Sequence, residues 1–115
     1  MLLSLVKDAS MGLDFETEWF ESASYNHPAV RRKITTLSLQ IDWKNVSGSK
    51  NGNIEISATN DMESFPFSRV YNLSSESNDS QIILIYPFYK YFKIKYYKNG
   101  NTDGIMNISS YCDVN

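Results

Sequence analysis

Three acidic side chains near the start of the chain have a spacing that could support metal binding or acid–base chemistry. Asp14, Glu16 and Glu18 alternate with other residues, so an extended backbone would place all three carboxylates on one face. Such a set could surround Ca²⁺ or supply a general acid and a general base. No Gly-containing calcium loop accompanies them, so we interpret them as a solvated outer face and predict neither a metal ion nor a cofactor.

Nucleophilic catalysis would have to use the single histidine. His27 precedes Pro28, and the candidate nucleophiles are the single cysteine, Cys112, and the serines. No strand–turn–helix signature of a nucleophilic serine accompanies them. The sequence therefore predicts no catalytic residues and a protein that is not an enzyme.

A row of tyrosines and lysines is the main candidate binding surface. The residues that share one face of an expected strand are Tyr91, Lys93, Lys95 and Tyr97. The residues between them, which should face the core, are Phe92, Ile94 and Tyr96. Aromatic rings beside cations can stack on sugars, or on bases while the lysines follow a phosphate backbone. A formal net charge of -2 argues against nucleic acid, which leaves a glycan, a protein contact or a solvated surface.

Alternating apolar residues predict that strands position these groups. Strands are expected at 34–43, 53–58, 67–73, 81–86, 89–98 and 105–111, with turn-forming residues between them. Residues 2–6 are expected to form an edge strand, and 13–20 a strand or a short helix with Leu13, Phe15, Thr17 and Trp19 on one face. We expect 34–43 and 53–58 to pair as a hairpin with a long loop, and 22–33 to be a loop.

Short strands at regular intervals indicate one all-β domain, either a sandwich or a barrel. We predict an antiparallel, jelly-roll-like β-sandwich of about eight strands over 1–115, with an N-terminal arm and the first strands in 1–33 and the core in 34–111. A single cysteine excludes an internal disulfide, so packing must stabilise the fold. The apolar segment 1–6 is too short for a signal peptide or a membrane span, and we expect neither.

The middle and end of the chain resemble a known family. The stretches that carry the resemblance are Leu39-Gln-Ile-Asp-Trp43, a Gly-containing loop, Ile54-Glu-Ile-Ser-Ala-Thr-Asn-Asp61, Tyr89-Lys-Tyr-Phe-Lys-Ile-Lys-Tyr96 and Gly104-Ile-Met-Asn-Ile108. Over roughly 34–110 the chain resembles small β-sandwich virion proteins of tailed bacteriophages. The Asn60-Asp61 turn and the Tyr-Lys-rich strand also resemble galactose-binding-like, discoidin-type jelly rolls. Met62 stands where both patterns have Gly, so we expect a turn of a different type or a longer one, and we transfer no ligand to it.

The resemblance implies a virion structural protein that acts through assembly contacts at a capsid surface, a connector or a tail. Its partners would be other virion proteins and further copies of itself, and it would be made in the host cytoplasm and located in the virion. The residues of the candidate assembly arm are Leu2, Leu3, Leu5 and Val6, which could add a strand to another subunit. A carbohydrate-binding module or host-attachment domain is the alternative. We expect neither nucleic acid nor a membrane as a partner.

Overall fold

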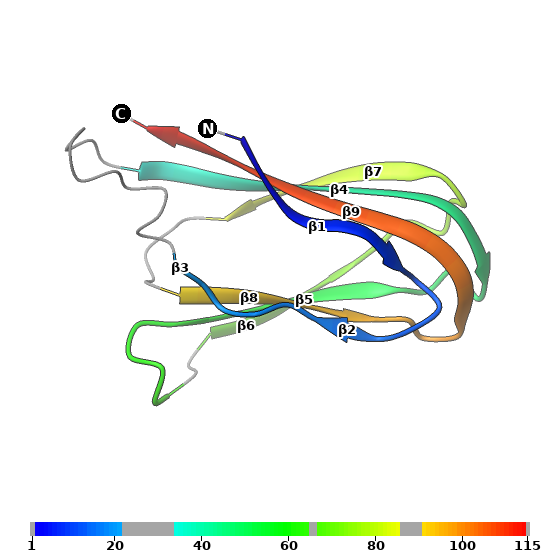
Figure 1. The fold of residues 1–115 in the computed structure, drawn as a ribbon, viewed down its shortest axis with the longest axis horizontal. Helices are drawn as coiled ribbons and strands as arrows, with labels where there is room; N and C mark the ends of the chain where they lie inside the picture. The colour runs from blue at the N-terminus through cyan, green and yellow to red at the C-terminus, as the bar shows by residue number, and fades with distance from the viewer. Residues whose placement is uncertain (1, 22–33, 65–66, 86–90, 115) are drawn as a thin grey trace.

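Two antiparallel sheets pack face to face in the computed structural model of this chain (Figure 1). The structure describes residues 2–21, 34–64, 67–85 and 91–114. The strands in these ranges are β1 (Leu2–Ser10), β2 (Phe15–Glu16), β3 (Phe20–Glu21), β4 (Ile34–Gly48), β5 (Asn53–Thr59), β6 (Phe67–Asn72), β7 (Asp79–Ile85), β8 (Tyr91–Tyr97) and β9 (Asn101–Val114). One sheet has the order β1-β9-β4-β7, and the other has the order β2-β8-β5-β6 with β3 also paired to β8.

The chain changes sheet at nearly every connection. Only the β5–β6 hairpin and the two short strands β2 and β3 keep successive strands in one sheet. Because β2 and β3 both pair with β8, they act as one interrupted strand, which brings the described strands to eight. The two sheets together have the wrapped order of a jelly roll. The predicted antiparallel, jelly-roll-like sandwich of about eight strands is confirmed.

The core lies between the two sheets and follows from period-2 alternation. Both β5 and β8 bury every second residue and leave the intervening ones half-buried. The largest fully buried apolar side chains are Tyr96, Phe92, Met11, Leu39, Ile41, Ile54, Ile56, Ile94, Met106 and Ile108. Burying each of these contributes about 1.5–3 kcal/mol relative to exposure, before conformational entropy is subtracted. The prediction that Phe92, Ile94 and Tyr96 face the core is confirmed.

The predicted hairpin between 34–43 and 53–58 is wrong. β4 pairs with β7 and β9, whereas β5 pairs with β6 and β8 in the opposite sheet. The polar stretch after Trp43 does not reverse the chain; β4 continues to Gly48 with register shifts beyond Lys44. Positive φ angles of 58° at Asn45 and 100° at Gly48 bend it toward the other sheet. Alternation identified both strands correctly but carries no information about which strand each one pairs with.

Residues 13–20 form an interrupted strand in place of the continuous one predicted. Phe15 lies opposite Tyr96 and Phe20 lies opposite Phe92, so five steps along one strand match four along β8. The extra residue makes a bulge, which reverses the faces of the residues after it. Phe20 therefore packs against the core in the place expected for Trp19, with ring centroids of Phe20 and Phe92 5.4 Å apart. Leu13, also predicted to face inward, is 65% exposed.

Two further expectations concern the loop at 22–33 and the absence of a membrane span. The predicted loop at 22–33, which contains His27, lies outside the described residues. Within the described ranges, no helix has the length and apolar character needed to cross a membrane.

Candidate functional site

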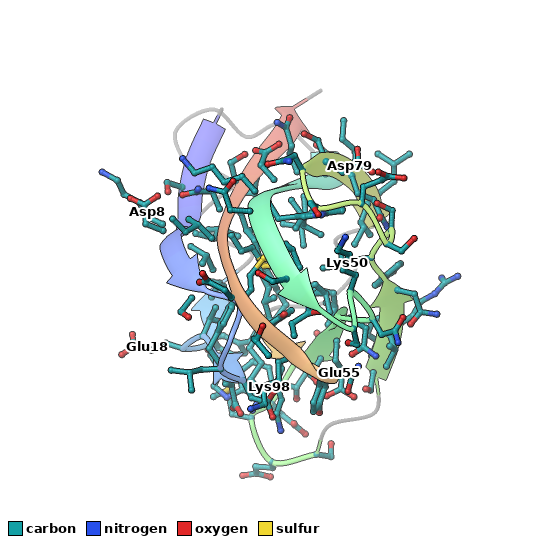
Figure 2. All side chains as sticks on the ribbon, turned by 90° about the vertical axis from the view of Figure 1, so that its right-hand side faces the viewer. Asp8, Glu18, Lys50, Glu55, Asp79 and Lys98 are labelled. Atoms are coloured by element: carbon teal, nitrogen blue, oxygen red, sulfur yellow. The ribbon has the colours of Figure 1, made fainter. Side chains whose placement is uncertain are left out.

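The residues predicted as a binding row lie on the outer face of β8, which is an interior strand of its sheet. We call Tyr91, Lys93, Lys95 and Tyr97 the Lys–Tyr row. Their side chains are half-buried because β2, β3 and β5 flank the strand. Viewed along the sandwich, the side chains of Asp8 and Glu18 point outward on one side and that of Asp79 on the other, while carbon fills the space between the sheets (Figure 2). The row therefore belongs to a polar outer surface, and its neighbours decide what it can bind.

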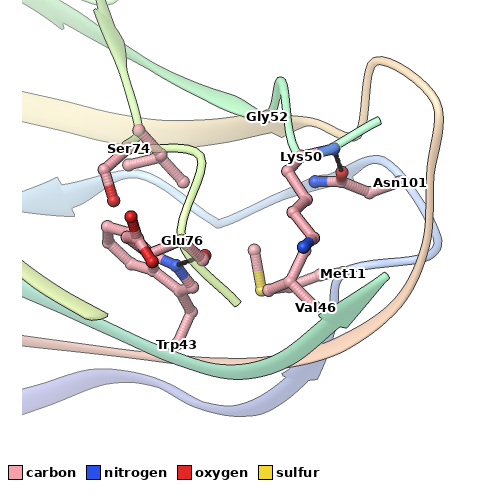
Figure 3. A pocket seen from close by; sticks show the side chains of 9 residues that line it. Met11, Trp43, Val46, Lys50, Gly52, Ser74, Glu76 and Asn101 are labelled. Atoms are coloured by element: carbon pink, nitrogen blue, oxygen red, sulfur yellow. Dashed lines mark hydrogen bonds between the residues drawn. The ribbon is translucent and has the colours of Figure 1, made fainter. Parts of the chain in front are cut away.

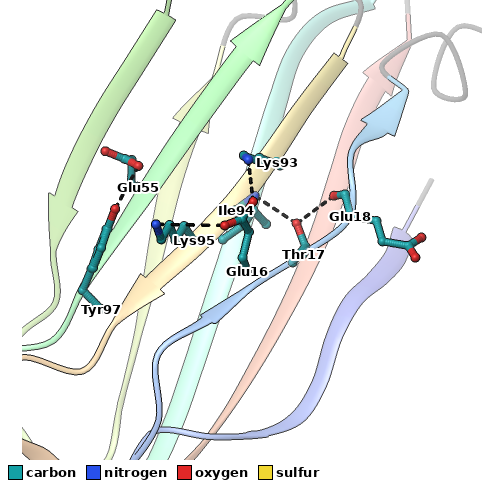
Figure 4. Close-up of polar contacts among 8 residues, drawn as sticks. All are labelled: Glu16, Thr17, Glu18, Glu55, Lys93, Ile94, Lys95 and Tyr97. Carbon is teal, nitrogen blue, oxygen red and sulfur yellow. Dashed lines mark hydrogen bonds and ion pairs between the residues drawn. The ribbon is translucent and has the colours of Figure 1, made fainter. Parts of the chain in front are cut away.

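Glu16 pairs with both lysines of the row (Figure 4). Its carboxylate accepts a hydrogen bond from Lys93 Nζ at 2.5 Å, and its second oxygen lies 4.0 Å from Lys95 Nζ. The hydrogen bond and the charge of Lys93 lower the pKa of Glu16 below its usual value. Both lysines thus have an acidic partner supplied by the neighbouring strand β2.

Aromatic rings complete the same network. Lys93 Nζ lies 4.8 Å from the centroid of the Trp19 ring, and Lys95 Nζ lies 5.0 Å from that of Tyr97. The Tyr97 hydroxyl donates to Glu55 Oε1 on β5 at 3.2 Å. Interaction with Tyr97, followed by the charges of Glu16 and Glu55, raises the pKa of Lys95. The row is therefore tied to the strands on both sides.

The bulge explains how Trp19 reaches this face. Thr17 N–H donates to the Ile94 carbonyl at 2.9 Å, and Ile94 N–H donates to Thr17 Oγ1 at 3.0 Å. A side-chain oxygen thus replaces the backbone carbonyl, and the next two residues lie opposite the single residue Lys93. Strict alternation missed Trp19 because it assumed no extra residue.

The charges on this face cancel. Lys93 and Lys95 contribute two positive charges, and Glu16 and Glu55 contribute two negative ones, so the four groups sum to zero. A surface that follows nucleic acid needs positive charge in excess. The geometry therefore gives no support to nucleic-acid binding at this face.

The three early carboxylates do not gather. The carboxylate of Asp14 accepts the Lys98 N–H at 2.8 Å, whereas that of Glu16 is engaged by the lysines. In the part of the chain that the structure describes, no three His, Cys, Asp or Glu side chains come close enough to hold a metal ion.

The candidate assembly arm forms β1 and pairs with β9 of the same chain. Leu2 lies opposite Tyr111, and Val6 lies opposite Ile108. The side chains of Leu5 and Val6 are partly buried against the core. In this chain the segment completes its own sheet, and addition to another subunit stays a prediction.

A buried polar cluster, which we call the clasp, closes one end of the sandwich. The Tyr96 hydroxyl donates to the Met11 carbonyl at 2.9 Å and accepts from Asn101 Nδ2 at 2.9 Å. Asn101 Oδ1 accepts the Lys50 N–H at 2.7 Å (Figure 3). Burial raises the pKa of Tyr96, which keeps the hydroxyl protonated and able to donate. The clasp joins the β1–β2, β4–β5 and β8–β9 connections.

The pocket beside the clasp is too small for a substrate. Its lining includes Met11, Trp43, Lys50, Glu76 and Asn101, and it has room for no more than about one water molecule. The Trp43 Nε1–H donates to the Glu76 carbonyl at 2.9 Å across its floor. This pocket is a packing feature of the fold.

The turn after β5 contains a residue in the left-handed conformation. Met62 adopts a positive φ of 61°, the conformation considered unfavourable for Met from the sequence, and the connection between Thr59 and Phe67 is longer than a tight turn. The Asp61 carboxylate accepts N–H bonds from Glu63 at 2.9 Å and Ser64 at 3.0 Å. Chiefly these backbone bonds, from Ser64 and then Glu63, lower the pKa of Asp61 to about 2. They hold the turn closed and offset the roughly 1–2 kcal/mol that a left-handed residue costs.

Sequence reasoning missed one pair of exposed apolar residues. Ile82 and Leu84 on β7 are 62% and 65% exposed. They lie on the outer face of the β1-β9-β4-β7 sheet, whereas the Lys–Tyr row lies on the outer face of the other sheet. Their signal was available in the sequence, because 82–85 is an unbroken apolar run. Such a run is typical of a strand covered on both faces. Here β7 buries Ile83 and leaves its neighbours in water.

Known proteins resemble this chain in structure but not in sequence. No family model and no curated protein matches the sequence. A chain of the infectious bursal disease virus T13 particle aligns over 99% of this chain with a TM-score of 0.58 and 9% identity. A chain from the Gx strain of that virus aligns over 96% with a TM-score of 0.56 and 9% identity. The aligned part is 30% of each viral chain, so this chain spans about a third of their length.

The VP2 subviral particle of the same virus gives a similar result. Its chain aligns over 96% of this chain with a TM-score of 0.50 and 8% identity, and the match covers 31% of that chain. At these identities the likeness concerns the β-sandwich alone.

Proposed function

We propose that this chain is a structural component of a virus particle, works through protein–protein contacts and catalyses no reaction. The jelly-roll strand order carries the proposal, together with its alignment over nearly the whole chain to a chain of a viral particle. Jelly rolls of this type build viral capsid domains as well as lectins. A sandwich whose β1–β2, β4–β5 and β8–β9 connections are joined by hydrogen bonds suits a part that must pack repeatedly against neighbours.

The outer surface supports the same function. The Lys–Tyr row is neutralised by its own glutamates, and the pocket beside the clasp has room for about one water molecule. Neither feature offers a poised nucleophile or a substrate cavity. What the surface does offer is exposed apolar side chains on edge strands, which protein contacts can bury.

Immunogold labelling tests the proposal directly. Antibodies raised against the purified chain should label virus particles isolated from cells that express it, and the chain should sediment with the particles through a density gradient. A chain found only in the fractions without particles would contradict a virion role. Preimmune serum on the same particles is the control.

The narrower form of the proposal follows the resemblance to tailed-bacteriophage virion proteins. In that form the chain sits at the capsid surface, the connector or the tail. Gold positions on tailed particles would distinguish these three places, and label confined to particles without tails would contradict the narrower form while leaving the broader one in force.

A glycan-binding surface is the second candidate, because the bulge adds Trp19 to the face that carries Tyr91 and Tyr97. Sugars stack on aromatic rings that also have polar groups nearby. A glycan array should then give hits that Trp19→Ala and Tyr97→Ala weaken and that Gln40→Ala, on the opposite outer face, leaves unchanged. An array without hits, or with hits that all three variants retain, would remove this candidate.

A further inference from the structure

Strand β7 has the properties of an edge that pairs with another chain. Among the described strands it is the last of its sheet, and it pairs with β4 from Leu37 to Trp43 without a register shift. A strand at the end of a sheet presents unpaired backbone N–H and C=O groups along its outer side. Its only charged residue is Asp79, at its first position. The strand is therefore regular in its pairing with β4 and uncharged over 80–85.

The other edges of the sandwich are protected against pairing in ways that β7 is not. β1 has two register shifts and a positive φ of 50° at Asp8. β2 and β3 are two residues each and are separated by the bulge. β6 carries Arg69 in its middle. Breaks, bulges and charges of these kinds discourage edge-to-edge association.

We propose that β7 pairs antiparallel with β7 of a second copy of this chain across a two-fold axis. The pairing would join two four-stranded sheets into one continuous sheet. The inference rests on the proposed function as an assembly subunit and specifies one of its contacts. The occupant is a second copy because a two-fold axis would set the uncharged part of this edge, with its exposed Ile82 and Leu84, against the same residues of the copy.

Self-complementarity follows from the geometry of antiparallel strands. Residues directly opposite each other lie on the same face, so a two-fold axis always sets the outward residues 80, 82 and 84 against members of the same set. With the axis at residue 83, Ile82 of one copy would face Leu84 of the other, and Leu84 would face Ile82. Cross-strand apolar pairs of this kind stabilise sheets, and no like charges oppose each other there.

Edge pairing fits the surroundings better than packing of one outer face on another. On β4, Gln40 lies opposite Ile82, and Gln40 Nε2 donates to Asp42 Oδ1 at 3.1 Å. Face-to-face packing would remove this amide and this carboxylate from water. Pairing along the β7 edge would bury part of the Ile82 and Leu84 side chains and leave the Gln40 amide and the Asp42 carboxylate in water.

Sedimentation analysis over a range of protein concentrations tests the pairing. The wild-type chain should form a dimer, and Ile82→Lys and Leu84→Lys should each raise its dissociation constant at least ~tenfold, because each places a charge among the apolar side chains that the pairing would bury. Val70→Lys is the matched control, since Val70 is 51% exposed on the edge strand β6, and it should leave the dimer unchanged. Circular dichroism should show that all three variants fold, because each side chain is exposed.

Hydrogen exchange gives a second measurement that does not depend on a variant. Protection of the amides in 80–84 should rise with protein concentration, and protection of the β6 amides should not. A wild-type monomer at every concentration, a dimer insensitive to both lysine variants, or equal loss with Val70→Lys would overturn the β7 pairing.

The two proposals can fail separately. A monomeric chain that still labels virus particles overturns the β7 pairing and leaves the virion role in place. A β7-dependent dimer from a chain that never enters particles supports the pairing and overturns the virion role.

Discussion

Two groups of polar contacts attach the chain between β1 and β4 to strand β8, and they differ mainly in burial. The clasp joins Met11, Tyr96 and Asn101 by hydrogen bonds in the interior. The ion-pair network joins Glu16 to Lys93 and Lys95 on the surface, where the Glu16 side chain is 43% exposed. Both groups use β8, and both connect residues far apart in the sequence.

The difference shows why conspicuous charges are poor guides to stability. When a surface ion pair is broken, water solvates both partners, so the net loss is small. When a buried hydrogen bond is broken, the remaining partner stays in the interior without water and retains its full desolvation cost. The Lys–Tyr row attracts attention in the sequence, yet the clasp should contribute more to the free energy of unfolding.

The largest effect on the free energy of unfolding should come from adding a side chain at Gly48, where the backbone of Gly100 leaves no room for one. An added Cβ at Gly48, where φ is 100°, would lie 2.5 Å from the backbone oxygen of Gly100. Gly48→Ala should lower the free energy of unfolding by about 3 kcal/mol, through backbone strain and a clash that cannot relax. Urea unfolding of the wild type and of Gly48→Ala measures this loss of free energy.

Gly100→Ala is the control for that substitution. Gly100 also has a positive φ, of 90°, but an added Cβ would meet only the Ser49 side chain, at 3.0 Å. We expect a smaller loss of about 1 kcal/mol. Equal losses for the two variants would show that the close approach at Gly48 is not the cause.

Removing the amide of the clasp should have the next largest effect. Asn101→Ala should reduce the free energy of unfolding by about 2 kcal/mol, because the Tyr96 hydroxyl and the Lys50 N–H both lose a partner. A double-mutant cycle with Tyr96→Phe should give a coupling energy of about 0.5–1.5 kcal/mol. Asn72→Ala, at an exposed position, should change little. Additive effects in the cycle would mean that the clasp is not a unit.

Breaking the surface network should cost much less. Glu16→Gln keeps the shape of the side chain and removes its charge, and we expect a loss of about 0.5 kcal/mol or less because the carboxylate is solvent-screened. The difference between wild type and variant, measured by thermal unfolding, should shrink in 1 M salt, where screening extends to about 3 Å. A loss as large as that of Asn101→Ala would reverse the ranking of the two contact groups.

The smallest effect should be a pH dependence at an exposed carboxylate. Backbone N–H bonds hold the pKa of Asp61 at about 2, below the ordinary value of 3.8 for an aspartate. Because the folded-state pKa is lowered, its stabilisation is fully present above pH 3.8 and is lost as the pH falls through about 2. An NMR titration of the carboxyl carbon measures it.

A variant separates the two kinds of donor at this turn. Ser64→Ala removes the side-chain hydroxyl and keeps the backbone N–H bonds, which are the largest cause of the lowered pKa. The pKa of Asp61 should therefore stay well below its usual value in this variant. A return to the usual value would assign the effect to the hydroxyl instead.

Alternation in the sequence was enough to predict the sandwich and the two faces of β8. It failed where a single residue changes the register, since the bulge before Phe20 has no signature in a row of apolar and acidic residues. It also failed on pairing, because β4 and β5 have the same pattern whether they share a sheet or face each other. The clasp was out of reach because Asn101 and Tyr96 look like an ordinary turn residue and a core residue. The hydrogen bond from Tyr96 to the Met11 carbonyl depends on a fold that brings together residues 85 positions apart in the sequence.

The pairing of β1 with β9 has a consequence for how quickly the protein can form. Leu2 lies opposite Tyr111, so β1 can pair with β9 only after roughly a hundred further residues have been added to the chain. Folds dominated by such distant pairings reach the native state in milliseconds to seconds, far more slowly than helical bundles of equal size. During synthesis at about 5–20 residues per second, β1 waits roughly 5–20 s for its partner. Its leucines remain exposed in that interval, which makes the nascent chain a candidate client for chaperones.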